Sequence, residues 1–231
     1  MNMNTLGLIG GLTSESTAVY YELLNKEVKA RLGAQYSSQL LLWSFNLSAV
    51  LPLYLDDKPA YIDAITEAGE MLKSNGVAAL MICSNSAHMA AEQLAERTQL
   101  PVLHILDALA VALEHKEIKR PLVLGTDFVM EEDFYIPNLC KRVDIDPLIP
   151  NADDRKVLND ILFTELISGT INPESRKRYL RVIEKAESEG ADGVILGCTE
   201  HCLLLNQSHH HLPMLDSTSL HVKAAINFQL S

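Results

Sequence analysis

The chain has 231 residues, of which 48% are hydrophobic, so it can bury a substantial core as one large domain or two small ones. Its formal net charge of -11 argues against nucleic acid and anionic membranes as partners, because both require basic surface. No segment approaches the roughly 18 uninterrupted apolar residues that span a bilayer, and the first residues lack the pattern of a secretory leader. We therefore expect a cytoplasmic protein.

Short runs rich in Val, Ile and Leu alternate with longer amphipathic segments, which is typical of strand-helix-strand units around a parallel sheet. In chain order, the expected strands are Leu6–Ile9, Leu40–Phe45, Ala78–Cys83, Val102–Ile105, Leu122–Leu124, Val194–Leu196 and Met214–Leu215. The helical patterns between them include Ser16–Leu32, Ala60–Asn75, His88–Thr98, Asp154–Ser168 and Glu174–Glu189. The sequence therefore predicts an α/β fold.

The chain also resembles itself at an offset of about half its length, and such internal repeats bear directly on the fold. Three segments match in the same order: Gly10 with Gly125, residues 76–86 with 190–200, and residues 100–103 with 212–215. We infer two similar α/β domains with mainly parallel sheets, related by pseudo-twofold symmetry, with an active-site cleft between them. The first domain comprises residues 1–102 plus 212–231, and the second comprises residues 103–211.

The middle match carries the candidate chemistry. Residues 84–86 and 198–200 each follow a strand and precede a helix, where ligands bind in parallel α/β sheets. Backbone N–H groups at such a place favour an anion and lower the pKa of a thiol, so we expect Cys198 to be partly thiolate. The predicted symmetry sets Ser84 and Cys198 on opposite sides of the cleft.

The four cysteines of the chain do not form a disulfide framework, and there is no C-x-x-C motif. We predict no functional metal, and we interpret the three histidines at residues 209–211 as part of a solvated loop. His88 and His201 lie close to Ser84 and Cys198 in the sequence and are expected to be surface residues of helices.

Together, these motifs resemble the aspartate/glutamate racemase family over essentially the whole chain. The resemblance rests on Gly10-Gly11-Leu12-Thr13 with Glu15-Ser16-Thr17, Ser84-Asn85-Ser86 with His88, Leu124-Gly125-Thr126 followed by Met130 and Phe134-Tyr135, and Gly197-Cys198-Thr199-Glu200. It implies a two-domain, often dimeric enzyme that racemises acidic amino acids without pyridoxal phosphate or another cofactor. Two cysteines on opposite faces of the α-carbon then act as base and acid.

This sequence departs from that family pattern at the first cysteine, where Ser84 precedes Asn85. Cys83 lies one position earlier, and because strand side chains alternate between faces, we expect it to be a buried core residue. The resemblance implies that Cys198 removes the α-proton of an L-amino acid and that Ser84 returns a proton to the opposite face. A hydroxyl is a poor base near neutral pH, so turnover of the D-enantiomer should be slower.

Seven further residues are expected to bind the substrate: Gly11, Leu12, Asn85, Ser86, Thr126, Thr199 and Glu200. Ordinary helix capping is the alternative role for Asn85, Ser86 and Thr199, and a helix dipole also favours an acidic residue such as Glu200. The Arg and Lys that aspartate racemases of this group commonly carry are missing from residues 44–57 and from position 167. Hydroxyls and amides would then hold the side-chain carboxylate, or the substrate is another amino acid.

Three other functions remain open at this point. One is a decarboxylase or lyase similar to the arylmalonate decarboxylases, which use only the second cysteine. Another is cis-trans isomerisation of the maleate type, with Cys198 as a nucleophile. The third is a protein that binds an amino acid without catalysis, because fold does not fix function.

Overall fold

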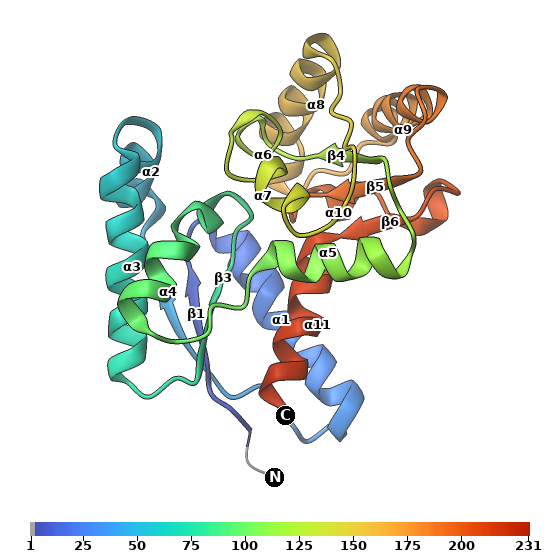
Figure 1. Ribbon diagram of the computed structural model, residues 1–231. Helices are drawn as coiled ribbons and strands as arrows, with labels where there is room; N and C mark the ends of the chain where they lie inside the picture. The colour runs from blue at the N-terminus through green and yellow to red at the C-terminus, as the bar shows by residue number, and fades with distance from the viewer. Residues whose placement is uncertain (1–2) are drawn as a thin grey trace. The chain divides into compact units, whose positions relative to one another are not determined.

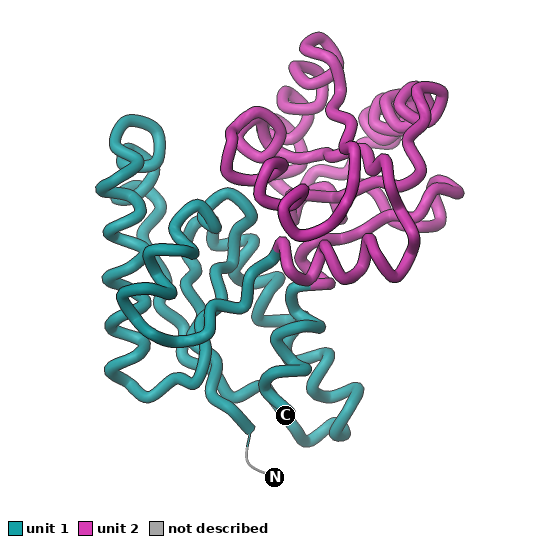
Figure 2. Tube along the Cα trace, viewed as in Figure 1, with its two compact units in different colours: residues 1–105, 221–231 teal, residues 106–220 magenta. Residues whose placement is uncertain are grey.

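A computed structural model describes residues 3–231 of the chain, which form two compact units (Figure 2). Unit 1 comprises the residues up to Ile105 together with His221–Ser231, and unit 2 comprises Leu106–Leu220. The division therefore differs from the predicted one, which placed residues 212–220 in the first domain. The physical reason is strand pairing, because the strand at Met214–Asp216 belongs to the sheet of unit 2.

Unit 1 contains a parallel sheet in the order β2-β1-β3 (Figure 1). Its strands are β1 (Leu6–Gly10), β2 (Leu40–Ser44) and β3 (Ala79–Ile82). The helices of this part of the chain are α1 (Ser14–Leu32), α2 (Leu47–Asp56), α3 (Lys58–Ser74), the 3-10 helix η1 (Ser86–Ala90), α4 (Ala91–Thr98) and most of α11 (Ser217–Gln229). Apolar side chains of β1, β3, α1 and α11 form one core cluster.

Unit 2 contains a second parallel sheet in the order β4-β5-β6. Its strands are β4 (Pro121–Leu124), β5 (Gly193–Leu196) and β6 (Met214–Asp216). Its helical segments are α5 (Ile105–His115), α6 (Asp127–Glu131), α7 (Ile136–Cys140), α8 (Ala152–Thr164), η2 (Leu166–Ser168), α9 (Pro173–Ser188), α10 (His201–Leu204) and η3 (Gln207–His209). Side chains of α8 and α9 pack on β4 and β5 in a separate core cluster.

The two sheets share one topology once their isolated bridges are included. In unit 1, Leu80 of β3 pairs in parallel with Val102, which extends the order to β2-β1-β3-Val102. In unit 2, Leu122 of β4 pairs in parallel with Leu148, which gives Leu148-β4-β5-β6. Each strand position of one unit thus has a counterpart in the other, and the predicted pair of similar α/β halves is confirmed.

The expected strand at Val102–Ile105 is present only as the bridge at Val102. The backbone of Leu80 exchanges two hydrogen bonds with this segment, through Pro101 O and the N–H of Leu103. Pairing stops there because the N–H of Ile105 is bonded to a histidine ring and the chain turns into α5. No described helix is long and apolar enough to cross a membrane.

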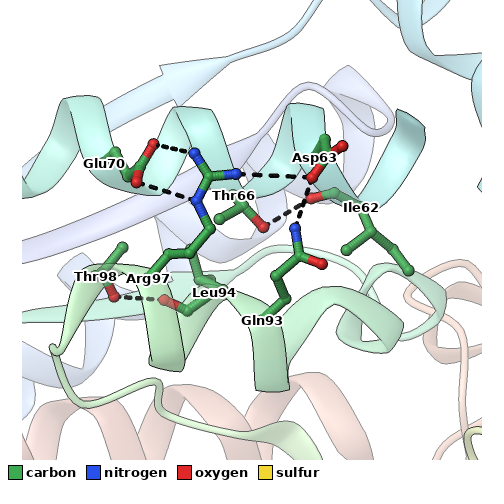
Figure 3. A network of polar contacts seen from close by, with 8 residues as sticks. All are labelled: Ile62, Asp63, Thr66, Glu70, Gln93, Leu94, Arg97 and Thr98. Carbon is green, nitrogen blue, oxygen red and sulfur yellow. Dashed lines mark hydrogen bonds and ion pairs between the residues drawn. The ribbon is translucent and has the colours of Figure 1, made fainter. Parts of the chain in front are cut away.

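Helices α3 and α4 of unit 1 are joined by a polar network (Figure 3). The guanidinium group of Arg97 donates two hydrogen bonds to Glu70, at 2.7 and 3.2 Å, and lies 3.6 Å from Asp63. These groups are about 40% exposed or more, so water screens the pairs and each contributes only about 0.2–1 kcal/mol. Leu94, which is fully buried under the network, contributes more to the packing of α4.

Candidate functional site

The carboxyl ends of β1 and β3 lie side by side in unit 1, because Ile9 and Ile82 are in register. The loop after β1 is held by side chains of α1. The Thr17 hydroxyl accepts the N–H of Gly11 at 2.8 Å and donates to Thr13 O at 2.9 Å. The N–H of Gly11 is therefore already bonded to Thr17 and contributes to the shape of this loop.

Gly11 is required at its position by both conformation and space. Its φ is +74°, and a Cβ there would lie 2.2 Å from the backbone N and O of Phe45. We expect Gly11→Ala to lower the free energy of unfolding by about 2–5 kcal/mol, combining left-handed strain with overpacking. Gly76→Ala is the matched control, because Gly76 has a φ of +81° and no atom within 4 Å of its Cβ position. Urea unfolding of both variants tests this, and equal losses would contradict the steric argument.

Ser84 follows β3 and is partly exposed, as expected for a residue at the sheet edge. Its Oγ lies 3.3 Å from Ser86 Oγ, and Asn85 between them is buried. Neither Asn85 nor another side chain caps η1, so ordinary capping does not explain these residues. Cys83 is fully buried in the core cluster, as predicted, and burial raises the pKa of its thiol.

His88 is buried, contrary to the expectation of a surface helix residue, because its ring bridges two backbone segments. Ring atom Nδ1 lies 2.7 Å from Ser84 O, and Nε2 lies 3.2 Å from the N–H of Ile105. A carbonyl oxygen only accepts and an N–H only donates, so the proton is on Nδ1 and the ring is neutral. The Ser84 backbone is thereby anchored to the start of α5.

A second buried histidine, which was not predicted, packs edge-on against His88 with 5.3 Å between ring centroids. Nε2 of His221 lies 2.6 Å from Leu103 O, and Nδ1 accepts the Tyr20 hydroxyl at 3.0 Å. Burial, together with a smaller effect of the adjacent His88, lowers the pKa of His221 to about 3, although the hydrogen bond to the Leu103 carbonyl acts in the opposite direction. No sequence pattern marks this contact, because His221 is more than a hundred residues from His88.

In unit 2, the corresponding sheet edge carries Thr126 after β4 and Cys198 after β5. The Cys198 thiol donates to Glu200 Oε2 at 2.7 Å, and the Thr199 hydroxyl donates to the same oxygen at 2.7 Å. Glu200 is buried, whereas Cys198 and Thr199 are partly exposed. The structure thus brings three predicted site residues into direct contact, and Glu200 accepts hydrogen bonds from the other two.

The expected thiolate at Cys198 is wrong for this structure. Loss of hydration raises the pKa of the Cys198 thiol well above its usual value, and the negative charge of Glu200 raises it further. Hydrogen bonds from the local backbone act in the opposite direction but are outweighed. The following helix, α10, has only four residues, so its dipole offers little compensation. Cys198 is therefore a thiol at rest.

We expect Glu200→Gln to lower the pKa of Cys198, because the substitution removes the adjacent negative charge. The thiolate fraction near neutral pH should rise at least about tenfold. The pH dependence of iodoacetamide labelling, resolved for the Cys198 peptide by mass spectrometry, measures it. Thr199→Val keeps the charge and serves as control, and a labelling profile of Glu200→Gln that matched wild type would contradict the assignment.

Buried polar groups surround this edge of unit 2. The Thr126 Oγ1 atom is buried and, among the described residues, has no hydrogen-bond partner. Tyr135 is fully buried, and its hydroxyl would lie 3.6 Å from a Cβ at Gly197. Its pKa is raised by burial and by the proximity of Cys198. Tyr135 belongs to a motif quoted above, but only the fold places it beside Cys198.

His201 is also buried, contrary to its predicted surface position, and packs edge-on against Tyr179 at 5.4 Å. Burial lowers the pKa of His201 to about 4, although Glu200 and the Leu124 carbonyl act in the opposite direction. Within the described chain, neither ring nitrogen of His201 has a hydrogen-bond partner. Ser84 lies in unit 1 and Cys198 in unit 2.

Comparisons with known proteins agree with this arrangement. The family model described as Asp/Glu/Hydantoin racemase matches residues 9–225. The broad specificity amino-acid racemase RacX of Bacillus subtilis is 21% identical over 98% of both chains. The crystal structure of a candidate Asp/Glu racemase from Yersinia pestis is 36% identical, with a TM-score of 0.94 over 99% of this chain and 100% of that one.

A crystal structure from Pyrococcus horikoshii, described as an aspartate racemase homologue, is 28% identical, with a TM-score of 0.87. It covers 99% of this chain and 100% of that one. The family match spans both units and includes the loops that carry Ser84 and Cys198. On these grounds the chain belongs to the Asp/Glu/hydantoin racemase family.

Proposed function

We propose that this protein is a cofactor-independent racemase of acidic amino acids, aspartate or glutamate, with a preference for the L-enantiomer. The observation that carries the proposal is the contact between the Cys198 thiol and Glu200 Oε2, on a loop that the family model covers. A thiol beside a carboxylate has an acceptor for its proton at hand. The proposal also includes a cytoplasmic location and a homodimer. Gel filtration tests the oligomeric state.

In the proposed reaction, Cys198 passes its proton to Glu200 Oε2 across the 2.7 Å hydrogen bond. The thiolate then takes the α-proton of the L-substrate and leaves a carbanion. The Ser84 hydroxyl donates a proton to the opposite face of this carbanion and recovers one from solvent. Cys198 ends the step as a thiol that carries the substrate proton. Glu200 releases the proton it received to solvent, which balances the proton that Ser84 takes up, so the substrate inverts and the enzyme returns to its starting state.

The surroundings of Ser84 support the direction of the reaction. Its Oγ contacts Ser86 Oγ, while the nearby ring of His88 is bonded to the Ser84 carbonyl and to the N–H of Ile105. A hydroxyl without a base beside it donates a proton more readily than it removes one. We therefore propose slower turnover from the D side.

Substrate binding is proposed for Asn85 and Ser86 of unit 1 and for Thr126 and Thr199 of unit 2. The unpartnered Thr126 Oγ1 is the strongest support, because a buried hydroxyl without a partner costs free energy that a ligand oxygen would recover. Leu12 is buried, so it would contribute shape rather than polar contacts. Glu200 is proposed to act through Cys198, because its Oε2 atom already accepts from the thiol.

The deciding experiment uses Ser84→Ala with L-aspartate and L-glutamate in deuterated water. Proton NMR follows loss of the α-proton, and chiral chromatography follows the D-product. If Cys198 removes the α-proton and Ser84 returns one to the opposite face, the variant still exchanges the α-proton through Cys198 but forms almost no D-product. Unchanged formation of D-product would overturn the role of Ser84. No exchange by wild type with either substrate, together with carbon dioxide release from an arylmalonate, would favour the decarboxylase alternative.

A further inference from the structure

We infer a binding site for a divalent transition metal of the Zn²⁺ class on unit 2, formed by Glu187, His210 and His211. Glu187 lies in the last turn of α9, and the two histidines follow η3 before β6. One potential ligand atom from each residue lies within 4.8 Å of the other two. No sequence motif joins these residues, because Glu187 is more than twenty residues from the histidines.

The contacts already converge on the Glu187 carboxylate. His211 Nε2 lies 2.7 Å from Oε1, and His210 Nε2 lies 3.6 Å from Oε2. The two rings are stacked, with 4.5 Å between centroids and 28° between planes. Zinc binds imidazole nitrogen and carboxylate oxygen at about 2.0–2.2 Å, so tetrahedral ligand atoms are separated by roughly 3.4 Å. Small side-chain rotations therefore suffice to admit the ion.

The local electrostatics favour a cation. The C-terminal end of α9 carries the negative pole of the helix dipole, and Glu187 adds a full negative charge there. Across the described chain, the Glu187 carboxylate is paired only with the two histidine rings, while Lys185 is directed to Asp154. Glu184, one turn earlier, lines the same open depression. A metal ion would satisfy a carboxylate that has no Lys or Arg partner.

Binding requires a change of tautomer at His210. Its Nδ1 accepts the N–H of Leu212 at 3.2 Å, so the neutral ring carries its proton on Nε2. A metal at Nε2 moves that proton to Nδ1 and costs one hydrogen bond, which three metal–ligand bonds outweigh. His209 is not included among the metal ligands, because its Nδ1 accepts the N–H of Asn206 in a capping box. Two histidines and one carboxylate leave a further coordination position for water.

The test is isothermal titration of the full chain with ZnCl₂ near neutral pH, supported by the absorption spectrum of the Co²⁺ form. We expect one ion per chain, with a Co²⁺ spectrum that lacks thiolate charge transfer. His211→Ala and Glu187→Gln should each weaken binding at least about tenfold. Both side chains are at the surface, so the variants are expected to fold, which circular dichroism checks.

Two matched controls sharpen the result. Glu184→Gln removes the neighbouring carboxylate of the same helix and should leave affinity within about twofold. Cys198→Ala removes the competing thiol and should not affect the titration. Loss of binding in Cys198→Ala, equal binding in His211→Ala, or no binding at millimolar zinc would each overturn the site. None of these outcomes depends on racemase activity.

Discussion

Replacing Cys198 with alanine is expected to lower the rate of α-proton exchange from an L-substrate by at least about 10³-fold, within the range of positioned acid–base groups. The Cys198 thiol is a titratable group on a partly exposed residue of this loop, and Glu200, which is buried, accepts a hydrogen bond from it. The loss should fall on kcat, because the hydroxyls that are proposed to bind the substrate remain. Proton NMR in deuterated water measures it.

Cys202 provides the matched control for this variant. It lies four residues after Cys198, in α10, and is also partly exposed, but burial and the charge of Asp216 raise the pKa of its thiol. We expect Cys202→Ala to keep exchange within a factor of a few. Exchange that survives in Cys198→Ala, or that disappears equally in Cys202→Ala, would remove Cys198 from its proposed role.

Acid should destabilise both units, through His221 in unit 1 and His201 in unit 2. Their pKa values are lowered to about 3 and about 4, against 6.5 for an ordinary histidine. Because the folded pKa is the lower one, the unfolded chain binds the proton first. The stability is complete above pH 6.5 and is lost as the pH falls toward the folded values. Between pH 7 and pH 5, the free energy of unfolding of each unit should fall by about 2 kcal/mol.

His201→Phe isolates one of these contributions. The ring nitrogens of His201 make no good hydrogen bond in the described structure, so a phenyl ring fits the same contact with Tyr179. Urea unfolding measures the decrease in the free energy of unfolding from pH 7 to pH 5. In the variant this decrease should be smaller than in wild type by about 2 kcal/mol. An identical loss in both proteins would mean that His201 is not the titrating group.

The positions of most strands along the chain and the internal repeat were predictable from sequence, because strands leave local apolar runs and the repeat is a direct match of residues. β1, β3, β4 and β5 are continuous buried runs, and the repeat places Ser84 and Cys198 at equivalent strand ends. The short α2 helix, by contrast, has no clear helical period, since it is almost uniformly apolar and contains Pro52. Its exposed face carries Leu47, Leu51 and Leu55.

The electrostatic state of the candidate site was not predictable. The pKa of Cys198 depends on the 2.7 Å contact with Glu200 and on loss of hydration. Neither the contact nor the burial of the thiol can be read from the sequence. The same holds for His88, whose ring nitrogens reach the Ser84 carbonyl and the N–H of Ile105. Residue types therefore indicate which groups are candidates for the site, whereas their protonation depends on the fold.

The opposed tautomers of His88 and His221 bear on how Ser84 is supplied with protons. His88 carries its proton on Nδ1 and His221 on Nε2, and both protons point at backbone carbonyls. The other two nitrogens accept from Ile105 and Tyr20, so no nitrogen of one ring faces a nitrogen of the other. The two rings cannot form a proton wire. These two rings therefore do not relay protons to each other, and the hydrogen that Ser84 is proposed to deliver is expected to come from bulk water.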